Sequence, residues 1–144
     1  LVMDPYSLGY NSNSFDLPLN HKVFLAAFDT IKELASKGPC VFVGRCADYA
    51  LSEYKDCFSV FVHADTDWRI NRLSQKHNKT AKEAKDMINK TDKSRSSYYN
   101  YYTNKKWGAA SSYNLCVDSS KLGIDGAAKA IIQAIEIFDS IKNK

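Results

Sequence analysis

The sequence predicts an α/β fold built on a parallel sheet, within a single domain of 144 residues. Three short apolar runs with strand propensity lie at 41–43, 59–65 and 113–120. Segments with helical spacing of apolar residues separate them, and strands that alternate with helices usually pair in parallel. The runs are apolar on both faces, which is typical of strands covered by helices on each side.

Composition places the chain among ordinary globular proteins. Hydrophobic residues make up 44% and charged residues 25%, and the formal net charge is +4. This mild positive charge is compatible with phosphate-bearing ligands and is too small to indicate nucleic-acid binding by itself. No signal peptide or apolar run of membrane length is present, so we predict a cytoplasmic protein with no membrane partner.

The four cysteines predict free thiols in a reducing environment. None forms a C-x-x-C pair, and the three histidines do not complete a zinc pattern, so no metal site is predicted. Cys40 and Cys116 lie in or beside apolar runs, which predicts that both thiols are buried.

The first predicted helix precedes the first predicted strand. Residues 1–19 have the composition of a loop, and Asn20 is expected to cap a helix that ends at Gly38. The strand at 41–43 follows and hands over to Gly44 and Arg45. Ligands of open α/β sheets bind at the carboxyl ends of the strands, where Arg45 could grip a phosphate with two hydrogen bonds. An ordinary surface arginine in a loop is about equally plausible on this stretch alone.

Two further helices are predicted after the second strand. Thr66 is expected to cap the first, and Thr80 with Glu83 forms a capping box at the start of the second, which runs toward Arg95. An aromatic and basic segment, 97–108, follows. The last helix is expected to begin near Asp125, after the third strand.

The positions of the four arginines suggest phosphate chemistry. Arg45, Arg69, Arg72 and Arg95 lie at a strand end or on the two helices after the second strand, whereas the sixteen lysines are scattered. Phosphoryl transfer requires neutralisation of charge spread over several oxygens, which converging arginines provide. The alternative is that they lie on solvated helix faces. A base at His63 is a weaker possibility, because a histidine at a strand end is usually structural.

Several of these stretches together resemble the cytidylate-kinase-like family of P-loop nucleoside monophosphate kinases, from about Leu17 to about Phe138. The resemblance is carried by Lys37-Gly-Pro-Cys-Val-Phe-Val-Gly-Arg-Cys-Ala-Asp-Tyr49, Phe61-Val-His-Ala-Asp65 with Arg69 and Arg72, Thr91-Asp-Lys-Ser-Arg-Ser-Ser-Tyr-Tyr99, Lys105-Lys-Trp-Gly108 and Cys116-Val-Asp-Ser-Ser120. It implies a three-layer α/β/α fold with a parallel sheet and a helical lid over 66–107. Residues 1–37 would belong to the acceptor-binding region.

The resemblance also implies a role for each candidate residue. Arg45 would hold the acceptor monophosphate, and Asp48 would lie beside the acceptor sugar or base. The catalytic group would be Arg69 and Arg72, reaching the ATP phosphates, with Arg95 at the transferring phosphoryl. Asp92 would orient Arg95 or the acceptor. The donor adenine would lie near Asp118, Ser119 and Ser120. The implied cofactors are ATP and Mg²⁺, and the implied activity is transfer of the ATP γ-phosphoryl to a nucleotide such as CMP or dCMP.

One part of the family pattern is missing from the sequence. The six glycines cannot form G-x-x-x-x-G-K-[ST] or G-x-G-x-x-G, so the phosphate loop and its strand are absent from these 144 residues. We therefore expect the chain to be an N-terminally truncated part of a longer protein. The family's Gly-Arg-Asp is also replaced by Gly44-Arg45-Cys46, with the carboxylate displaced to Asp48.

Two non-catalytic functions remain open from the sequence. Five aromatic residues beside two lysines could stack RNA bases and meet phosphates: Tyr98, Tyr99, Tyr101, Tyr102 and Trp107, with Lys105 and Lys106. The simpler interpretation, which we prefer, is that these rings pack a helix onto the rest of the protein. The chain could also be an inactive, regulatory relative of the kinases.

Overall fold

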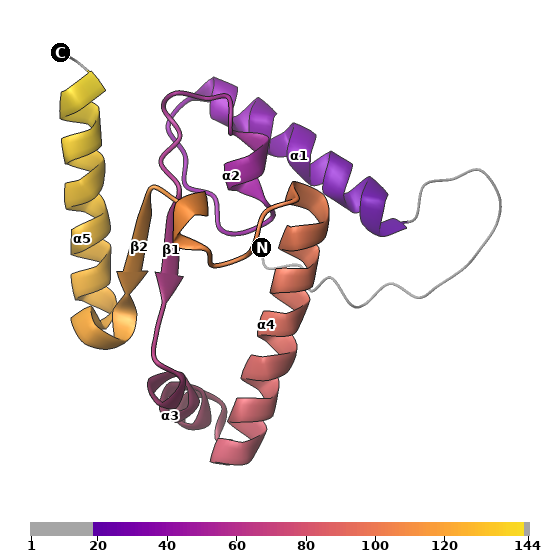
Figure 1. Cartoon of the computed structure of the whole chain (residues 1–144), viewed down its shortest axis with the longest axis vertical. Helices are drawn as coiled ribbons and strands as arrows, with labels where there is room; N and C mark the ends of the chain where they lie inside the picture. The colour runs from indigo at the N-terminus through magenta and orange to yellow at the C-terminus, as the bar shows by residue number, and fades with distance from the viewer. Residues whose placement is uncertain (1–18, 143–144) are drawn as a thin grey trace.

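The computed structural model describes residues 19–142, which form a mixed α/β structure that is mostly helical (Figure 1). The elements in chain order are α1 (Leu19–Lys37), α2 (Ala47–Ala50), β1 (Val60–His63), α3 (Thr66–His77), α4 (Ala81–Thr103), a short 3-10 helix (Ala110–Ser112), β2 (Leu115–Asp118) and α5 (Ser119–Lys142). The loop predicted over 1–19 lies almost wholly outside the described residues.

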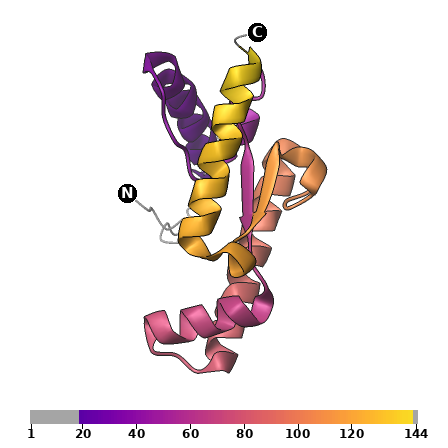
Figure 2. The ribbon, with the colours of Figure 1, turned by 90° about the vertical axis from the view of Figure 1, so that its left-hand side faces the viewer.

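A two-stranded parallel sheet forms the centre of the described structure. β1 and β2 pair in a register that places Val60 opposite Leu115 and His63 opposite Asp118. α5 covers one face, while the segment between α4 and β2 lies over the other (Figure 2). The rings of Phe61 and Trp107 meet edge to face on this second side, with centroids 5.4 Å apart. An element thus packs on each face of the sheet, as its apolar strands predict, while Val62 of β1 stays 52% exposed.

The prediction of a third strand at 41–43 is wrong. Residues 39–43 form no regular secondary structure and pair with no strand among the described residues, and Val41 and Val43 are 92% and 91% exposed. An apolar run becomes a strand only when a neighbouring strand takes up its backbone hydrogen bonds. Because the predicted sheet is reduced to two strands, Arg45 follows an unpaired segment rather than a strand end. Cys40, predicted to be buried, is exposed for the same reason.

Helix ends differ from prediction by a few residues. α1 begins at Leu19, so Asn20 lies inside it, and the N-cap of α3 is Asp65 rather than Thr66. Asp65 accepts hydrogen bonds from the backbone N–H groups of the next turn, which a carboxylate does at least as well as a hydroxyl. α5 begins at Ser119, with a kink at Gly123 (φ +68°) before the helix predicted from Asp125.

The capping box at the start of α4 is confirmed. The Thr80 hydroxyl accepts a hydrogen bond from the backbone N–H of Glu83, whose carboxylate accepts from the backbone N–H of Thr80. α4 then runs to Thr103 and includes most of the aromatic segment that the sequence analysis placed after the helix. Helical spacing within 97–103 therefore decides which of its rings face the protein.

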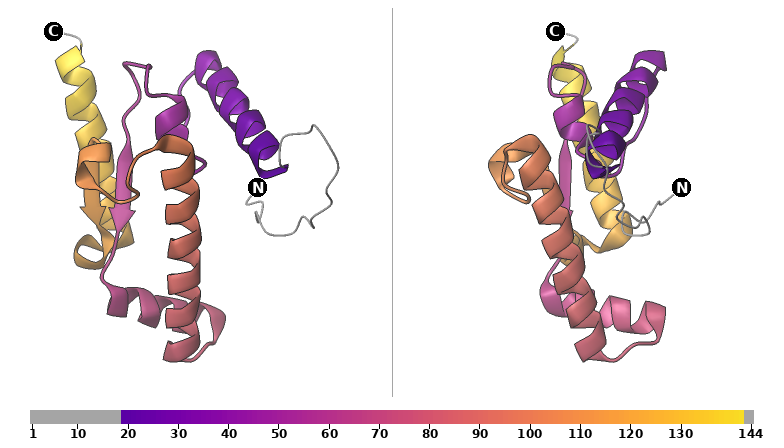
Figure 3. Two further views of the ribbon diagram at one scale, coloured as in Figure 1. Left: turned by 45° about the vertical axis from the view of Figure 1, so that its right-hand side comes forward. Right: turned by 90° about the vertical axis from the view of Figure 1, so that its right-hand side faces the viewer.

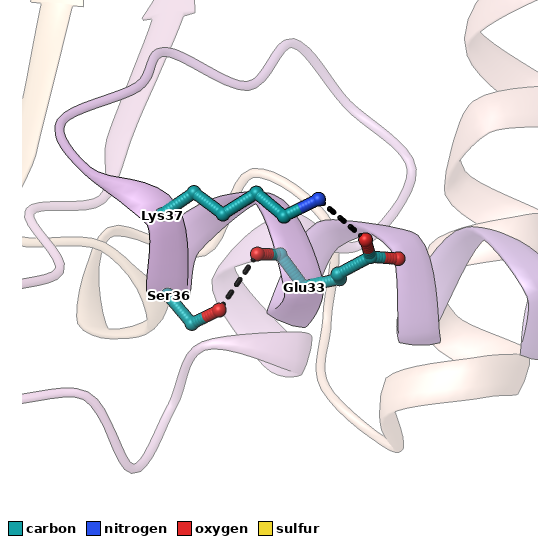
Figure 4. Close-up of polar contacts among 3 residues, drawn as sticks. All are labelled: Glu33, Ser36 and Lys37. Atoms are coloured by element: carbon teal, nitrogen blue, oxygen red, sulfur yellow. Dashed lines mark hydrogen bonds and ion pairs between the residues drawn. The ribbon is translucent and has the colours of Figure 1, made fainter.

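Local contacts close the last turn of α1 (Figure 4). The Lys37 ammonium pairs with the Glu33 carboxylate at 2.5 Å, and the Ser36 hydroxyl donates to the Glu33 carbonyl at 2.8 Å. Gly38 follows with φ +149°, a conformation that suits glycine and ends the helix. The predicted helix stop is confirmed.

Two apolar clusters connect α1 to the rest of the protein. The first is centred on Ile31 of α1 with α2 residues Ala47 and Ala50. The second joins Phe24 of α1, Cys46 and Tyr99 of α4, with further aromatic rings around them. We call this second group the aromatic cluster, and its partly buried members are Phe28, Tyr98, Tyr102, Trp107 and Tyr113. It fixes the segment before α2 between two long helices.

Among residues 19–142, none of the helices combines the length and the apolarity that a membrane span would need.

Candidate functional site

A tight turn carries Arg45. The Ala47 N–H donates to the Gly44 carbonyl at 3.1 Å, and the two residues between them, Arg45 and Cys46, both have φ +56°. Positive φ at both central positions is the signature of a type I′ turn, which favours glycine, asparagine or aspartate. Arginine and cysteine pay a steric cost there of roughly 1–2 kcal/mol each. Such strain persists only where the surrounding structure holds it.

Asp48 lies next to this turn and is held by α4. The Tyr99 hydroxyl donates to the Asp48 carboxylate at 2.7 Å. The Tyr99 ring is buried, with the Tyr113 ring 6.2 Å away between centroids. Burial and this hydrogen bond together raise the pKa of Tyr99, so its hydroxyl stays protonated and remains a donor. The contact links residues 51 positions apart.

The side chains on the inner side of the turn are shielded from solvent. Cys46 is 4% exposed, and burial, with a smaller contribution from the Asp48 charge, raises the pKa of its thiol to about 12. Burial also raises the pKa of Tyr98, an effect that the nearby Arg45 guanidinium partly opposes. Cys46 therefore acts as a small apolar filler of the aromatic cluster, while Arg45 remains half-buried at its border.

Arg69 and Asp92 join α3 to α4. The guanidinium Nη1 and Nη2 atoms of Arg69 donate to the two Asp92 oxygens at 2.7 and 2.9 Å. Both side chains are partly buried, and the pairing raises the pKa of Arg69 further. In the structure Asp92 thus orients Arg69, and its role toward Arg95 or the acceptor stays a prediction. One edge of the Arg69 fork is committed to this contact.

Arg72 and Arg95 are exposed. The Arg72 guanidinium lies over the Trp68 ring, 5.5 Å from its centroid, and borders an open hollow lined by Gln75 and Lys76. Among the described residues, no hydrogen bond or ion pair engages Arg95, which stands one turn after Asp92 on α4. Both can therefore meet an anion without first breaking a protein hydrogen bond.

Asp118, Ser119 and Ser120 lie where the two parallel strands end. The Ser120 hydroxyl donates to Asp118 and accepts from the Asp65 N–H, and the Ser119 hydroxyl donates to the His63 carbonyl. These bonds fasten the carboxyl end of β2 to that of β1. Their polar side chains are thus occupied by the fold, and any contact with an adenine would use what these bonds leave over.

We expect Ser120→Ala to raise the pKa of Asp118. The hydrogen bonds from Ser120 are the main cause of the lowered pKa of this carboxylate. A lowered pKa in the folded state adds stability above the unfolded value of about 3.9, and that stability is lost as pH falls through the folded pKa. Loss of the hydroxyl therefore removes part of this stabilisation at neutral pH. NMR titration of the carboxyl measures the midpoint.

The matched control for this titration is Ser119→Ala. Its hydroxyl donates to His63 and not to Asp118, so the Asp118 midpoint should stay near that of the natural chain. An unchanged midpoint in Ser120→Ala would show that the backbone, not the hydroxyl, sets the acidity of Asp118.

Seven of the nine predicted site residues form three separate groups. Arg45 lies in the turn before α2 and Asp48 in α2 itself, Arg69 pairs with Asp92, and residues 118–120 lie at the strand ends. Arg72 and Arg95 belong to none of these groups. α4 connects the first two groups, because one of its ends lies beside α3 and the other beside α2 (Figure 3). No described contact joins the four arginines to one another.

The aromatic residues considered for RNA stacking are mostly packed inside the protein. Tyr99 is buried, and Tyr98, Tyr102 and Trp107 are half-buried members of the aromatic cluster. Tyr102 stacks on Phe24 of α1 with ring centroids 4.0 Å apart. Tyr101 differs, with 79% of its surface exposed. The preferred interpretation, that these rings pack a helix onto the body, is confirmed for the packed four.

Among residues 19–142, no group of three or more acidic, histidine or cysteine side chains is arranged to hold a metal ion. In kinases Mg²⁺ is held largely by the substrate phosphates, so the residues described do not by themselves define a Mg²⁺ site.

Comparisons with known proteins place the chain in a family. Its sequence matches the cytidylate kinase-like family over residues 2–121. The fold is similar to the crystal structure of an uncharacterized protein from Eubacterium ventriosum ATCC 27560, with a TM-score of 0.78 and 32% sequence identity. That match covers 82% of this chain and 74% of the other. No curated protein matches. The chain belongs to the cytidylate kinase-like family.

Proposed function

We propose that the protein is a nucleoside monophosphate kinase-like phosphotransferase that moves the ATP γ-phosphoryl group to a nucleotide acceptor, with CMP and dCMP the first candidates. The observation that carries the proposal is the family match over residues 2–121, which spans all the candidate site residues. The position of Arg45 in a strained turn supports it, since strain of this kind gathers at ligand sites.

The proposed reaction needs cationic groups around the acceptor phosphate, the donor phosphates and the transferring phosphoryl group. An acceptor phosphate oxygen attacks the γ-phosphorus, the β–γ bridging bond breaks, and ADP leaves with that electron pair. Arg45 would grip the acceptor monophosphate, and Asp48 would accept hydrogen bonds from its sugar or base. Arg72 and the remaining edge of Arg69 would meet the donor phosphates, and Arg95 the transferring group.

In this proposal α3 and α4 form the lid of a three-layer P-loop kinase fold. The two helices pack against each other, and α3 with the first turns of α4 lies beyond the carboxyl ends of the strands (Figure 1). The bidentate pair between Arg69 and Asp92 would keep them together as they move over bound ATP. ATP, accompanied by Mg²⁺, would supply the phosphoryl group, and Asp118 with its two serines would border the adenine.

The test is a panel of acceptors with the full-length natural protein. These 144 residues contain no glycine-rich phosphate loop. The intact mass of the natural protein is therefore measured first, and the acceptor panel is then run on that same protein. With MgATP and CMP, dCMP, UMP, AMP or GMP, we expect ADP and the nucleoside diphosphate in equal amounts, fastest with the cytidylates. No diphosphate from any acceptor would overturn the proposal and favour a binding or regulatory role.

A further inference from the structure

We propose that Tyr99 is the positioning residue of the 44–48 turn, and that it holds Arg45 and Asp48 ready for an anionic ligand that also carries hydrogen-bond donors. By the 44–48 turn we mean Gly44 to Asp48, the type I′ turn and the first residues of α2. The turn is at the same time strained, dry on its inner side, and tied to α4 by one charged hydrogen bond. Its ligand, an acceptor nucleotide monophosphate, rests on the proposed function.

The first argument is that the turn needs a restraint. Gly44, Arg45 and Cys46 all have positive φ, and the last two carry side chains that disfavour it. A single backbone hydrogen bond, from Ala47 to Gly44, closes the turn. One such bond stabilises the turn by less than two left-handed residues with side chains destabilise it. Contacts from outside the turn must therefore stabilise it.

The second argument is that Tyr99 provides these contacts. Its ring lies in the aromatic cluster with Cys46 and Phe24, and Cys46 is almost wholly buried there. Its hydroxyl donates to Asp48 at 2.7 Å. Ring and hydroxyl thus hold the middle of the turn and its end, and a hydrogen bond to a carboxylate is worth more than a neutral one.

The third argument concerns the ligand. The hydrogen bond from Tyr99 uses one Asp48 oxygen, and no other hydrogen bond joins this carboxylate to a described residue. The second oxygen can accept from a donor such as a sugar hydroxyl or an exocyclic amino group. Arg45 stands three residues earlier in the same short turn. A cation and an acceptor carried by one short turn suit a ligand with a phosphate and a donor, which is the chemistry of a nucleotide.

The positioning role can be tested without a ligand, because the turn contains a thiol. Peptide-resolved alkylation by iodoacetamide reports how often the buried Cys46 opens, and the exposed Cys40 gives an internal reference. We expect Tyr99→Phe to raise the alkylation rate of Cys46 by about tenfold, the loss expected for one hydrogen bond to a charge. The rate at Cys40 should not change. Tyr101→Phe is the matched control, since its ring is exposed.

The ligand part uses the same variants. Tyr99→Phe should weaken the binding of the acceptor monophosphate by about tenfold in an isothermal titration, while the affinity for ATP stays the same. Asp48→Ala breaks the same contact from the other side, so it should also speed Cys46 alkylation. Asp48→Ala replaces Tyr99→Phe as the test variant if circular dichroism shows that Tyr99→Phe does not fold.

The outcomes separate the two proposals. An unchanged Cys46 rate in both folded variants overturns the positioning role, whatever the affinities. A faster rate in a protein that binds no nucleotide leaves the positioning role supported and contradicts the proposed function. A faster rate with unchanged acceptor affinity shows that the turn is restrained by Tyr99 but does not meet the ligand, which overturns the second half of the inference.

Discussion

Arg95→Ala is expected to lower kcat for phosphoryl transfer by about 10³-fold, with little effect on folding. Arg95 is exposed on α4, and no described hydrogen bond or ion pair depends on it, so its removal leaves the helix and its packing intact. The substitution removes stabilisation of the transition state, where charge develops on the oxygens of the migrating phosphoryl group. A steady-state assay with the best acceptor of the panel gives kcat and both KM values, and KM should change much less than kcat.

The control for Arg95→Ala is Lys93→Ala, an exposed cation two residues earlier on the same helix. It removes the same formal charge from α4, so an equal loss in both variants would indicate a general field effect rather than a contact. Arg95→Lys keeps the charge but not the planar fork and should recover only part of the rate. A full rate in Arg95→Ala would remove Arg95 from the catalytic group.

Local signals in the sequence identified most of the helices. The capping box at Thr80, the stop at Gly38 and the apolar spacing of α1 each act within one or two turns, so they can be read without knowing the fold. β1 and β2 were also found, because their apolar runs do pair. The run at 41–43 has the same local signal, but strand formation depends on a neighbour that the run itself does not encode.

The candidate site was predictable by residue type and only partly by geometry. Arg45 was predicted as a phosphate ligand because it follows an apolar run and Gly44, although that run forms no strand. Arginine and cysteine disfavour positive φ, so the left-handed conformation of Arg45 and Cys46 could not be predicted from their residue types. Two contacts that matter here span 23 and 51 residues, Arg69 with Asp92 and Tyr99 with Asp48. No local pattern in the sequence marks such pairs.

Replacing Arg45 separates its backbone strain from its chemistry. Arg45→Ala and Arg45→Gly both delete the guanidinium. Both should therefore lower the affinity for the acceptor monophosphate by about 100-fold, the loss expected for two charged hydrogen bonds, and leave the affinity for ATP unchanged. The two variants differ in the cost of φ +56°. Glycine adopts this conformation freely, whereas alanine does not. Glycine also raises the chain entropy of the unfolded state, which offsets part of this gain. The Arg45→Gly variant should therefore be about 1 kcal/mol more stable than Arg45→Ala in urea unfolding.

The same pair of substitutions at Lys93 gives the control, with the opposite sign. Lys93 lies inside the regular helix α4, so glycine there should be about 1 kcal/mol less stable than alanine. If Arg45→Gly is no more stable than Arg45→Ala, the turn is not strained at this residue, and the argument that Tyr99 restrains it loses its first step. If the stabilities differ as expected but both variants keep the acceptor affinity, the strain is real and Arg45 does not hold the phosphate. Only the combination of greater stability with lost affinity identifies a position where the fold gives up stability to place a ligand-binding side chain.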